Sequence, residues 1–207
     1  AYKPNSAYYE ARGVQGLQEL KMTMEYLAKN YPDIFTILDA KRGDTGNTNL
    51  GYIQSVFDWL GFDAVTIHPY LGQEAVQPFL DRADKGSIIL CRTSNPGAGE
   101  FQDLETDGKP LYQVVAEHVK NWGSNLGVVV GATYPEELKK VREIVDDMPI
   151  LVPGIGVQGG DLKAVLDSGL NSKKQGLIIS SSRSIISAPD PRTAALKLHQ
   201  EIVSLLK

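Results

Sequence analysis

Short apolar runs alternate with amphipathic segments along almost the whole chain, and this alternation restricts the available folds more than any other feature. Apolar runs of this length are typical of buried strands, and the segments between them repeat their apolar residues at helical spacing. The expected strands are residues 1–3, 36–41, 64–68, 87–92, 126–130, 150–152 and 176–180. The expected helices are residues 14–29, 48–60, 73–84, 111–122, 135–146, 161–167 and 192–206.

Seven strand-then-helix units in succession predict an α/β fold with a parallel sheet covered by helices. Two architectures fit this pattern, an open doubly wound sheet and a closed (β/α)8 TIM barrel. A barrel takes about 250 residues and eight units, whereas this chain has 207 residues and begins at Ala1, without an initiator Met and inside an expected strand. We therefore expect a single barrel domain over residues 1–207 that lacks its first strand, with an N-terminal segment missing.

Composition narrows the function classes. The net charge of −4 predicts no general attraction to nucleic acid or to an anionic membrane surface. No apolar run approaches the ~18 residues of a membrane span, and no signal peptide is visible. The single cysteine, Cys91, lies in an apolar run and is expected in the core of a protein from a reducing compartment. A cytoplasmic protein is the expectation.

Opposite charges stand at the carboxyl end of the strand expected at residues 36–41. Asp39 and Lys41 stand two residues apart, so both side chains fall on the same face of a strand. Asp44 comes just after the strand, and residues 46–47 mark a turn before Thr48 opens a helix. Such charges are either solvated structural pairs or, if they point into a barrel, catalytic groups at the carboxyl end of a strand.

Two later loops have the composition of a phosphate site. Residues 153–161 are rich in glycine, which lets backbone N–H groups approach an anion closely. Arg183, in the polar stretch 181–184 after the last strand, offers a fork of donors. Loops after strands seven and eight are the recurrent phosphate site of TIM barrels. Residues 97–108, rich in Gly and acidic residues, are expected to form a mobile lid.

No metal site is predicted. His68 follows a strand and could line the mouth of a barrel, but no second His or Cys is arranged to share a metal with it. Asp39 and Asp44 could bind Mg²⁺, but the ammonium of Lys41 between them competes for that role.

Four motifs together resemble the orotidine 5′-monophosphate decarboxylase family, and most closely its longer bacterial-type branch. They are Tyr2-Lys3-Pro4-Asn5, Asp39-x-Lys41-x-x-Asp44 with Gly46-Asn47-Thr48, Arg92-Thr93-Ser94-Asn95-Pro96-Gly97, and the stretch from Pro153 to Gly160. The resemblance implies a TIM barrel, a homodimer, and the decarboxylation of orotidine 5′-monophosphate to UMP without a cofactor.

The resemblance also implies roles for individual residues. Lys3, Asp39, Lys41 and Asp44 would form an alternating charged network in which Asp39 faces the substrate carboxylate and Lys41 protonates the C6 carbanion. Asp44 and Thr48 would reach the neighbouring subunit's site. The remaining substrate-binding residues would be Ser94, on the pyrimidine, and Pro153, Gly156, Gln158 and Arg183, with Gln158 and Arg183 on the phosphate.

Two other functions stay open. Sugar-phosphate lyases of the same superfamily share Asp-x-Lys-x-x-Asp but need Mg²⁺ and carry an acidic ligand where this chain has Lys3. A non-catalytic nucleotide-binding barrel or an inactive fragment, suggested by the missing first strand, would bind UMP without turning over substrate.

Overall fold

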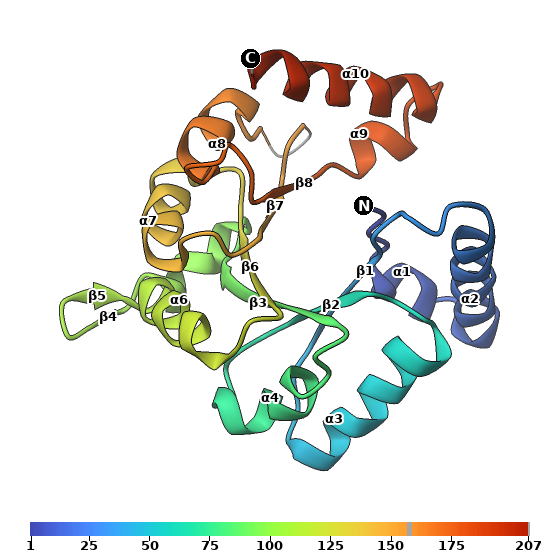
Figure 1. The fold of residues 1–207 in the computed structure, drawn as a ribbon, viewed down its shortest axis with the longest axis horizontal. Coiled ribbons are helices and arrows are strands. Elements are labelled where there is room, and N and C mark those ends of the chain that lie inside the picture. Colours follow the sequence, from blue (N-terminus) through green and yellow to red (C-terminus); the bar gives the residue numbers. More distant parts are fainter. Residues whose placement is uncertain (157–158, 207) are drawn as a thin grey trace. The chain divides into compact units, whose positions relative to one another are not determined.

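The computed structural model describes residues 1–156 and 159–206. Its chain divides into two compact units (Figure 1). The first comprises residues 1–90 and 122–127, and the second comprises residues 91–121 and 128–207. In the described part of the chain, no helix has both the length and the apolar character needed to cross a bilayer.

Parallel strands form the centre of the first unit. They are β1 (Ile37–Arg42), β2 (Ala64–Ile67) and the beginning of β3 (Gly86–Arg92). The register pairs Ile37 with Ala64, and Ala64 with Gly86. All four residues of β2 are buried, as expected for a parallel strand covered on both faces.

The helices of the first unit supply the apolar side chains that cover these strands. They are α1 (Ser6–Glu10), α2 (Gly13–Asn30), α3 (Gly46–Ile53), the π-helix η1 (Gln54–Trp59) and α4 (Gly72–Leu80). Helices α3 and α4 lie side by side (Figure 1). Phe57 of η1 and Phe79 of α4 are both buried and meet edge to face, with ring centroids 6.4 Å apart.

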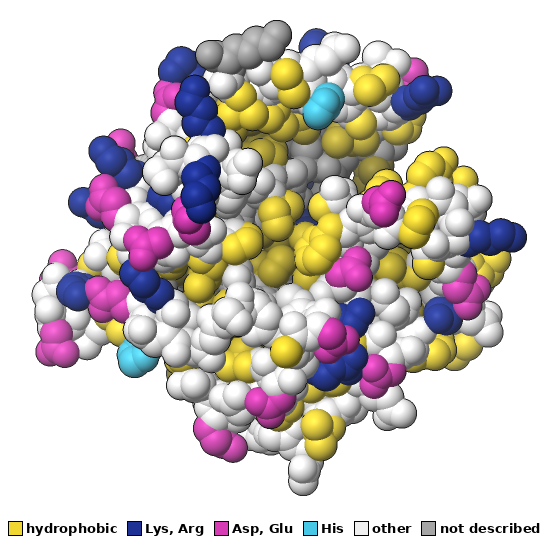
Figure 2. Space-filling view, viewed as in Figure 1, with side chains coloured by type: hydrophobic (Ala, Val, Ile, Leu, Met, Phe, Trp, Pro, Cys, Tyr) yellow, Lys and Arg dark blue, Asp and Glu magenta, His cyan; other side chains and the backbone are white. Residues whose placement is uncertain are grey.

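The second unit repeats the strand-then-helix pattern. Its elements are the short helices η2 (Pro96–Ala98) and α5 (Gly99–Gln102), the hairpin β4 (Glu105–Thr106) and β5 (Lys109–Pro110), then α6 (Leu111–Trp122), β6 (Leu126–Val130), α7 (Pro135–Val145), β7 (Ile150–Pro153), α8 (Leu162–Gly169), β8 (Leu177–Ser180), α9 (Arg183–Ile186) and α10 (Pro191–Leu205). Strands β6, β7 and β8 pair in parallel. Hydrophobic side chains lie at the surface over α10 (Figure 2), where Leu196 is 49% exposed and Val203 40%.

Strand order decides between the two architectures that the sequence allows. The order is β1-β2-β3-β6-β7-β8, which follows the chain without reversal. Strands β3 and β6 each begin in the first unit and end in the second. A doubly wound sheet reverses its order at a switch point, whereas a TIM barrel keeps it sequential. The order therefore favours the barrel.

Several local expectations need correction. Residues 1–3 form no full strand, although Tyr2 and Asn5 make parallel bridges to Thr36 and Asp39 beside β1. Helix α3 begins at Gly46 rather than Thr48. The helix expected to run to residue 60 becomes a π-helix from Gln54 onward. The expected lid at residues 97–108 contains short helices and the first strand of the β4–β5 hairpin, and its mobility stays a prediction.

Candidate active site

A largely buried carboxylate between two ammonium groups forms the centre of the charged site in the first unit. Asp39 Oδ2 lies 3.0 Å from Lys3 Nζ, and Asp39 Oδ1 lies 2.5 Å from Lys41 Nζ. The Asp39 and Lys3 side chains are only 14% and 12% exposed, whereas Lys41 is 48% exposed. The bridge between Asn5 and Asp39 aligns the N-terminal segment with β1, and Asn5 Nδ2 donates to Asp39 Oδ2 at 3.3 Å.

The surroundings of Asp39 favour its ionised form. Burial acts to raise its pKa, but the charges and hydrogen bonds of Lys3 and Lys41 outweigh burial. The pKa of Asp39 is therefore held below its ordinary value, and the carboxylate carries its charge at neutral pH. The predicted convergence of Lys3, Asp39 and Lys41 is seen in the structure.

Lys41 has an unusual backbone. Its φ is +48°, in the left-handed region that non-glycine residues seldom adopt. The β1–β2 register shifts in the same segment, between Leu38 and Arg42. The Oγ1 atom of Thr66, from β2, accepts from the backbone N–H of Ala40 at 3.0 Å and of Lys41 at 2.9 Å.

Asp44 lies in a loop whose backbone is held by hydrogen bonds to the side chain of Asn49. Its backbone N–H donates to Asn49 Oδ1 at 3.0 Å, and Asn49 Nδ2 donates to the Asp44 carbonyl at 2.6 Å. The Asp44 carboxylate accepts from the N–H of Thr45 at 2.7 Å. Asn49 is fully buried, while Thr48 is exposed on α3. The hydrogen bonds of Asn49 thus hold the loop that carries Asp44, while Thr48 stays at the surface.

Gly43 is required where this loop leaves β1. Its φ is +145°, and a Cβ there would lie 2.8 Å from the His68 carbonyl oxygen. The His68 N–H donates to the Arg42 carbonyl at 2.8 Å, so β2 and the start of the loop are in close contact. His68 Nδ1 is buried and has no hydrogen-bond partner among the described residues.

In the second unit, Ser94 lies in a loop organised by Arg92. The Arg92 side chain, 3% exposed, donates to Gln102 at 3.3 Å and to Asp103 at 3.1 Å, and its guanidinium stacks 4.1 Å from the Tyr134 ring centroid. Gln102 Oε1 also accepts from the N–H of Thr93 at 2.8 Å. These contacts fix the chain on both sides of Ser94.

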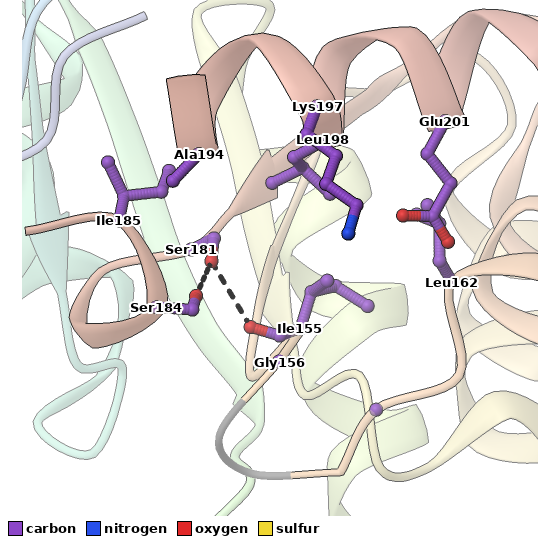
Figure 3. A pocket seen from close by; sticks show the side chains of 11 residues that line it. Ile155, Gly156, Leu162, Ser181, Ser184, Ile185, Ala194, Lys197, Leu198 and Glu201 are labelled. Atoms are coloured by element: carbon purple, nitrogen blue, oxygen red, sulfur yellow. Dashed lines mark hydrogen bonds between the residues drawn. The ribbon is translucent and has the colours of Figure 1, made fainter. Parts of the chain in front are cut away.

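The loops after β7 and β8 meet around a cavity of about 330 Å³ in the second unit (Figure 3). Ser181 Oγ hydrogen-bonds to Ser184 Oγ at 2.5 Å and to the Ile155 carbonyl at 3.3 Å. Lys197 and Glu201 of α10 line another side.

Four of the predicted phosphate-site residues belong to or flank these two loops. Gly156 lines the cavity with a φ of +96°, Pro153 ends β7, and the exposed Arg183 begins α9. Gln158 lies outside the described residues. The three that the structure describes therefore lie in or directly beside the two expected loops.

Cys91 has the structural role expected of it. It is buried, donates to the Tyr112 carbonyl at 3.0 Å, and burial raises the pKa of its thiol to about 12. Within residues 1–156 and 159–206, no three His, Cys, Asp or Glu side chains are grouped as metal ligands would be.

Sequence reasoning missed two residues that shape the site. Thr66 looks like an ordinary β-branched strand residue. Gly131 follows β6 and was not singled out, yet a Cβ there would lie 2.7 Å from Ser94 Cβ. Each acts through a tertiary contact that leaves no local sequence signal.

Residues 1–198 match the model of the orotidine 5′-phosphate decarboxylase / HUMPS family. The chain belongs to this family. The orotidine 5′-phosphate decarboxylase of Christiangramia forsetii is 52% identical over 92% of this chain and 70% of its own length. That of Flavobacterium johnsoniae is 47% identical over 99% of this chain and 78% of its own length.

The fold of this decarboxylase-family chain agrees with a solved relative. The structure of Leishmania donovani OMP decarboxylase matches it with a TM-score of 0.93 and 40% identity, covering 100% of this chain and 81% of that one. The predicted family and the α/β-barrel fold class are both confirmed.

Proposed function

We propose that this chain decarboxylates orotidine 5′-monophosphate to UMP and CO2, the last step of de novo UMP synthesis, and does so without a cofactor. The observation that carries the proposal is the Lys3-Asp39-Lys41 cluster, an ionised and largely buried carboxylate held between two ammonium groups. It occurs in a chain about half identical to named orotidine 5′-phosphate decarboxylases.

In the proposed reaction Asp39 faces the C6 carboxylate of the substrate. Two like charges about 4 Å apart repel by about 4 kcal/mol at an effective dielectric of 20, roughly three powers of ten in rate. This repulsion is relieved as CO2 leaves. It is too small to account for so difficult a decarboxylation alone.

Lys41 supplies the larger effect. When the C6–carboxylate bond breaks, its electron pair stays on C6, and a preorganised ammonium stabilises that developing negative charge. Lys41 Nζ then gives a proton to C6, which completes UMP. Lys3 keeps Asp39 ionised from the other side, at 3.0 Å.

The remaining predicted residues bind the rest of the substrate. Ser94 binds the pyrimidine, and Gln158 and Arg183 hold the phosphate with the loop of Pro153 and Gly156. Binding energy from the remote phosphate is used to align the reacting groups, so losing Arg183 should lower kcat as well as affinity.

A homodimer in the cytoplasm completes the proposal. The exposed Thr48 and the loop of Asp44 are available to reach a second copy of the chain, and each would complete the neighbouring site. The net charge of −4 supports a small-molecule substrate rather than nucleic acid or a membrane surface.

The test is turnover of orotidine 5′-monophosphate in the presence of a chelator, comparing the unmodified chain with Lys41→Ala. We expect turnover that disappears in the variant, while UMP binding stays measurable. Lys139→Ala, on the exposed face of α7, is the matched control and should retain full activity.

Three results would contradict the proposal. Retained turnover in Lys41→Ala would exclude Lys41 as the proton donor. Activity that needs added Mg²⁺ would point to a sugar-phosphate lyase. UMP binding without turnover would indicate a non-catalytic nucleotide-binding barrel.

A further inference from the structure

Lys41, the proposed proton donor, has a backbone conformation that must be stabilised by hydrogen bonds with other residues. Its φ of +48° interrupts the regular β1–β2 ladder, whose register shifts between Leu38 and Arg42. In a regular ladder the N–H groups of this segment would bond to carbonyls of the neighbouring strand. At such a shift they need another acceptor, because a buried N–H without a partner is costly.

The hydroxyl of Thr66 is that acceptor. Thr66 is 1% exposed, and its Oγ1 lies 3.0 Å from the Ala40 nitrogen and 2.9 Å from the Lys41 nitrogen. The same oxygen lies 3.0 Å from Asp39 Oδ1. One buried atom on β2 thus contacts three consecutive residues of β1.

Hydrogen-bond capacity fixes the direction of each bond. A hydroxyl has one hydrogen to donate and two lone pairs that accept. Both backbone partners are donors, so they occupy the lone pairs, and the hydrogen must go to Asp39. A hydrogen bond donated to a carboxyl oxygen is stronger when that carboxyl is ionised, so this bond favours the ionised form of Asp39.

We infer that Thr66 is a positioning residue for the decarboxylation proposed above, holding Lys41 in its left-handed conformation and directing a hydrogen bond to Asp39. Thr66 acts through these two residues and does not itself touch substrate. The inference rests on the proposed function for its catalytic consequence, while the contacts themselves can be tested without turnover.

Thr66→Val tests the inference because it keeps the shape of the side chain and removes only the hydroxyl. We expect kcat to fall about 10- to 100-fold, as activity does when a group that orients a metal ligand is lost. The affinity for UMP should change much less, since UMP has no C6 carboxylate. Thr66→Ser keeps Oγ1 and should restore kcat to near the wild-type value.

Ile67→Val is the matched control, because it trims the next buried residue of β2 without removing a polar group. Thermal unfolding of all three variants shows whether each is folded. A Thr66→Val enzyme with kcat within twofold of wild type would overturn the inference, as would Ile67→Val losing as much activity.

Amide hydrogen exchange and a ¹³C titration give readouts that do not depend on activity. In Thr66→Val the amides of Ala40 and Lys41 should exchange at least about tenfold faster, since they lose their buried acceptor. The titration midpoint of the Asp39 carboxyl, which also faces Lys3 and Lys41, should rise. Unchanged exchange rates and an unchanged titration midpoint would overturn the inference, whether or not the unmodified chain is active. An inactive unmodified chain would count against the proposed function alone.

Discussion

Replacing Gly131 by Ala should displace the Ser94 loop, which we propose binds the pyrimidine, through a single methyl group. A Cβ at residue 131 would lie 2.7 Å from Ser94 Cβ, 2.9 Å from its Cα and 3.0 Å from its nitrogen. Two of these three atoms are backbone, so no side-chain rotation relieves the clash. The φ of Gly131 is not in the positive range, so backbone strain at residue 131 itself does not contribute.

The magnitude follows from the geometry. Ordinary van der Waals contact begins near 3.4 Å, so the three Ser94 atoms must move away by roughly 0.4 to 0.7 Å. A displacement of about 1 Å in a positioning group can cost up to about 10²-fold in rate. We therefore expect kcat/KM for orotidine 5′-monophosphate to fall by about one power of ten.

Steady-state kinetics on Gly131→Ala and Gly97→Ala would check this reasoning. Gly97 lies in the same loop, and its added Cβ would meet only Asn95 Nδ2, at an ordinary 3.8 Å. Gly97→Ala should therefore keep kcat/KM within about twofold, the spread typical of surface substitutions. Wild-type kcat/KM in Gly131→Ala, with an unchanged melting temperature, would refute the reasoning.

Three further predictions concern stability and the Asp44 loop. Arg142→Met should lower the free energy of unfolding by about 3 kcal/mol, because four backbone carbonyls each lose a hydrogen-bond donor, those of Gly169, Asp146, Met148 and Gly176. Urea unfolding would measure this loss, with Lys140→Met at an exposed position as the control. A difference between the two variants below about 0.5 kcal/mol would contradict the prediction. The pKa of Asp39 is lowered in the folded chain, so its ionised form contributes stability above about pH 4, and this stability is lost as the pH falls through the folded pKa. The difference in melting temperature between wild type and Asp39→Asn should therefore shrink below about pH 4. A difference that stays constant with pH would contradict this prediction. Gly43→Ala should displace the Asp44 loop and lower kcat, since its Cβ would lie 2.8 Å from a backbone oxygen at a φ of +145°; a crystal structure with residues 43–49 unmoved would contradict this.

The sequence was most informative about elements that rest on local periodicity. Strand β6 and helix α6 have the predicted bounds, residues 126–130 and 111–122. The π-helix at Gln54–Trp59 was not predicted, because its apolar residues repeat much as those of an α-helix do. The short helices α1 and α9 were also missed, since four or five residues are too few to show a period.

Within the site, the sequence predicts charged residues better than their supports. Lys3 and Asp39 are 36 positions apart, yet a barrel brings the ends of neighbouring strands together, so their contact was foreseeable. The role of Thr66 was not, because it depends on a register shift that no local pattern encodes. Arg142 was missed for a similar reason: its partners are backbone carbonyls from three separate segments.

The energetics of the charged cluster argue for a functional origin. Burying ionised groups carries a large desolvation cost, and replacing a buried ion pair by apolar residues of similar volume is often neutral or stabilising. Stability alone therefore gives little reason to keep Lys3, Asp39 and Lys41 together, still less to hold Lys41 in a left-handed conformation that a regular strand would avoid. These costs are offset by the ammonium of Lys3 and by the hydroxyl of Thr66, both of which hydrogen-bond to the Asp39 carboxylate. Such support is expected where a carboxylate must stay ionised beside a proton donor for chemistry.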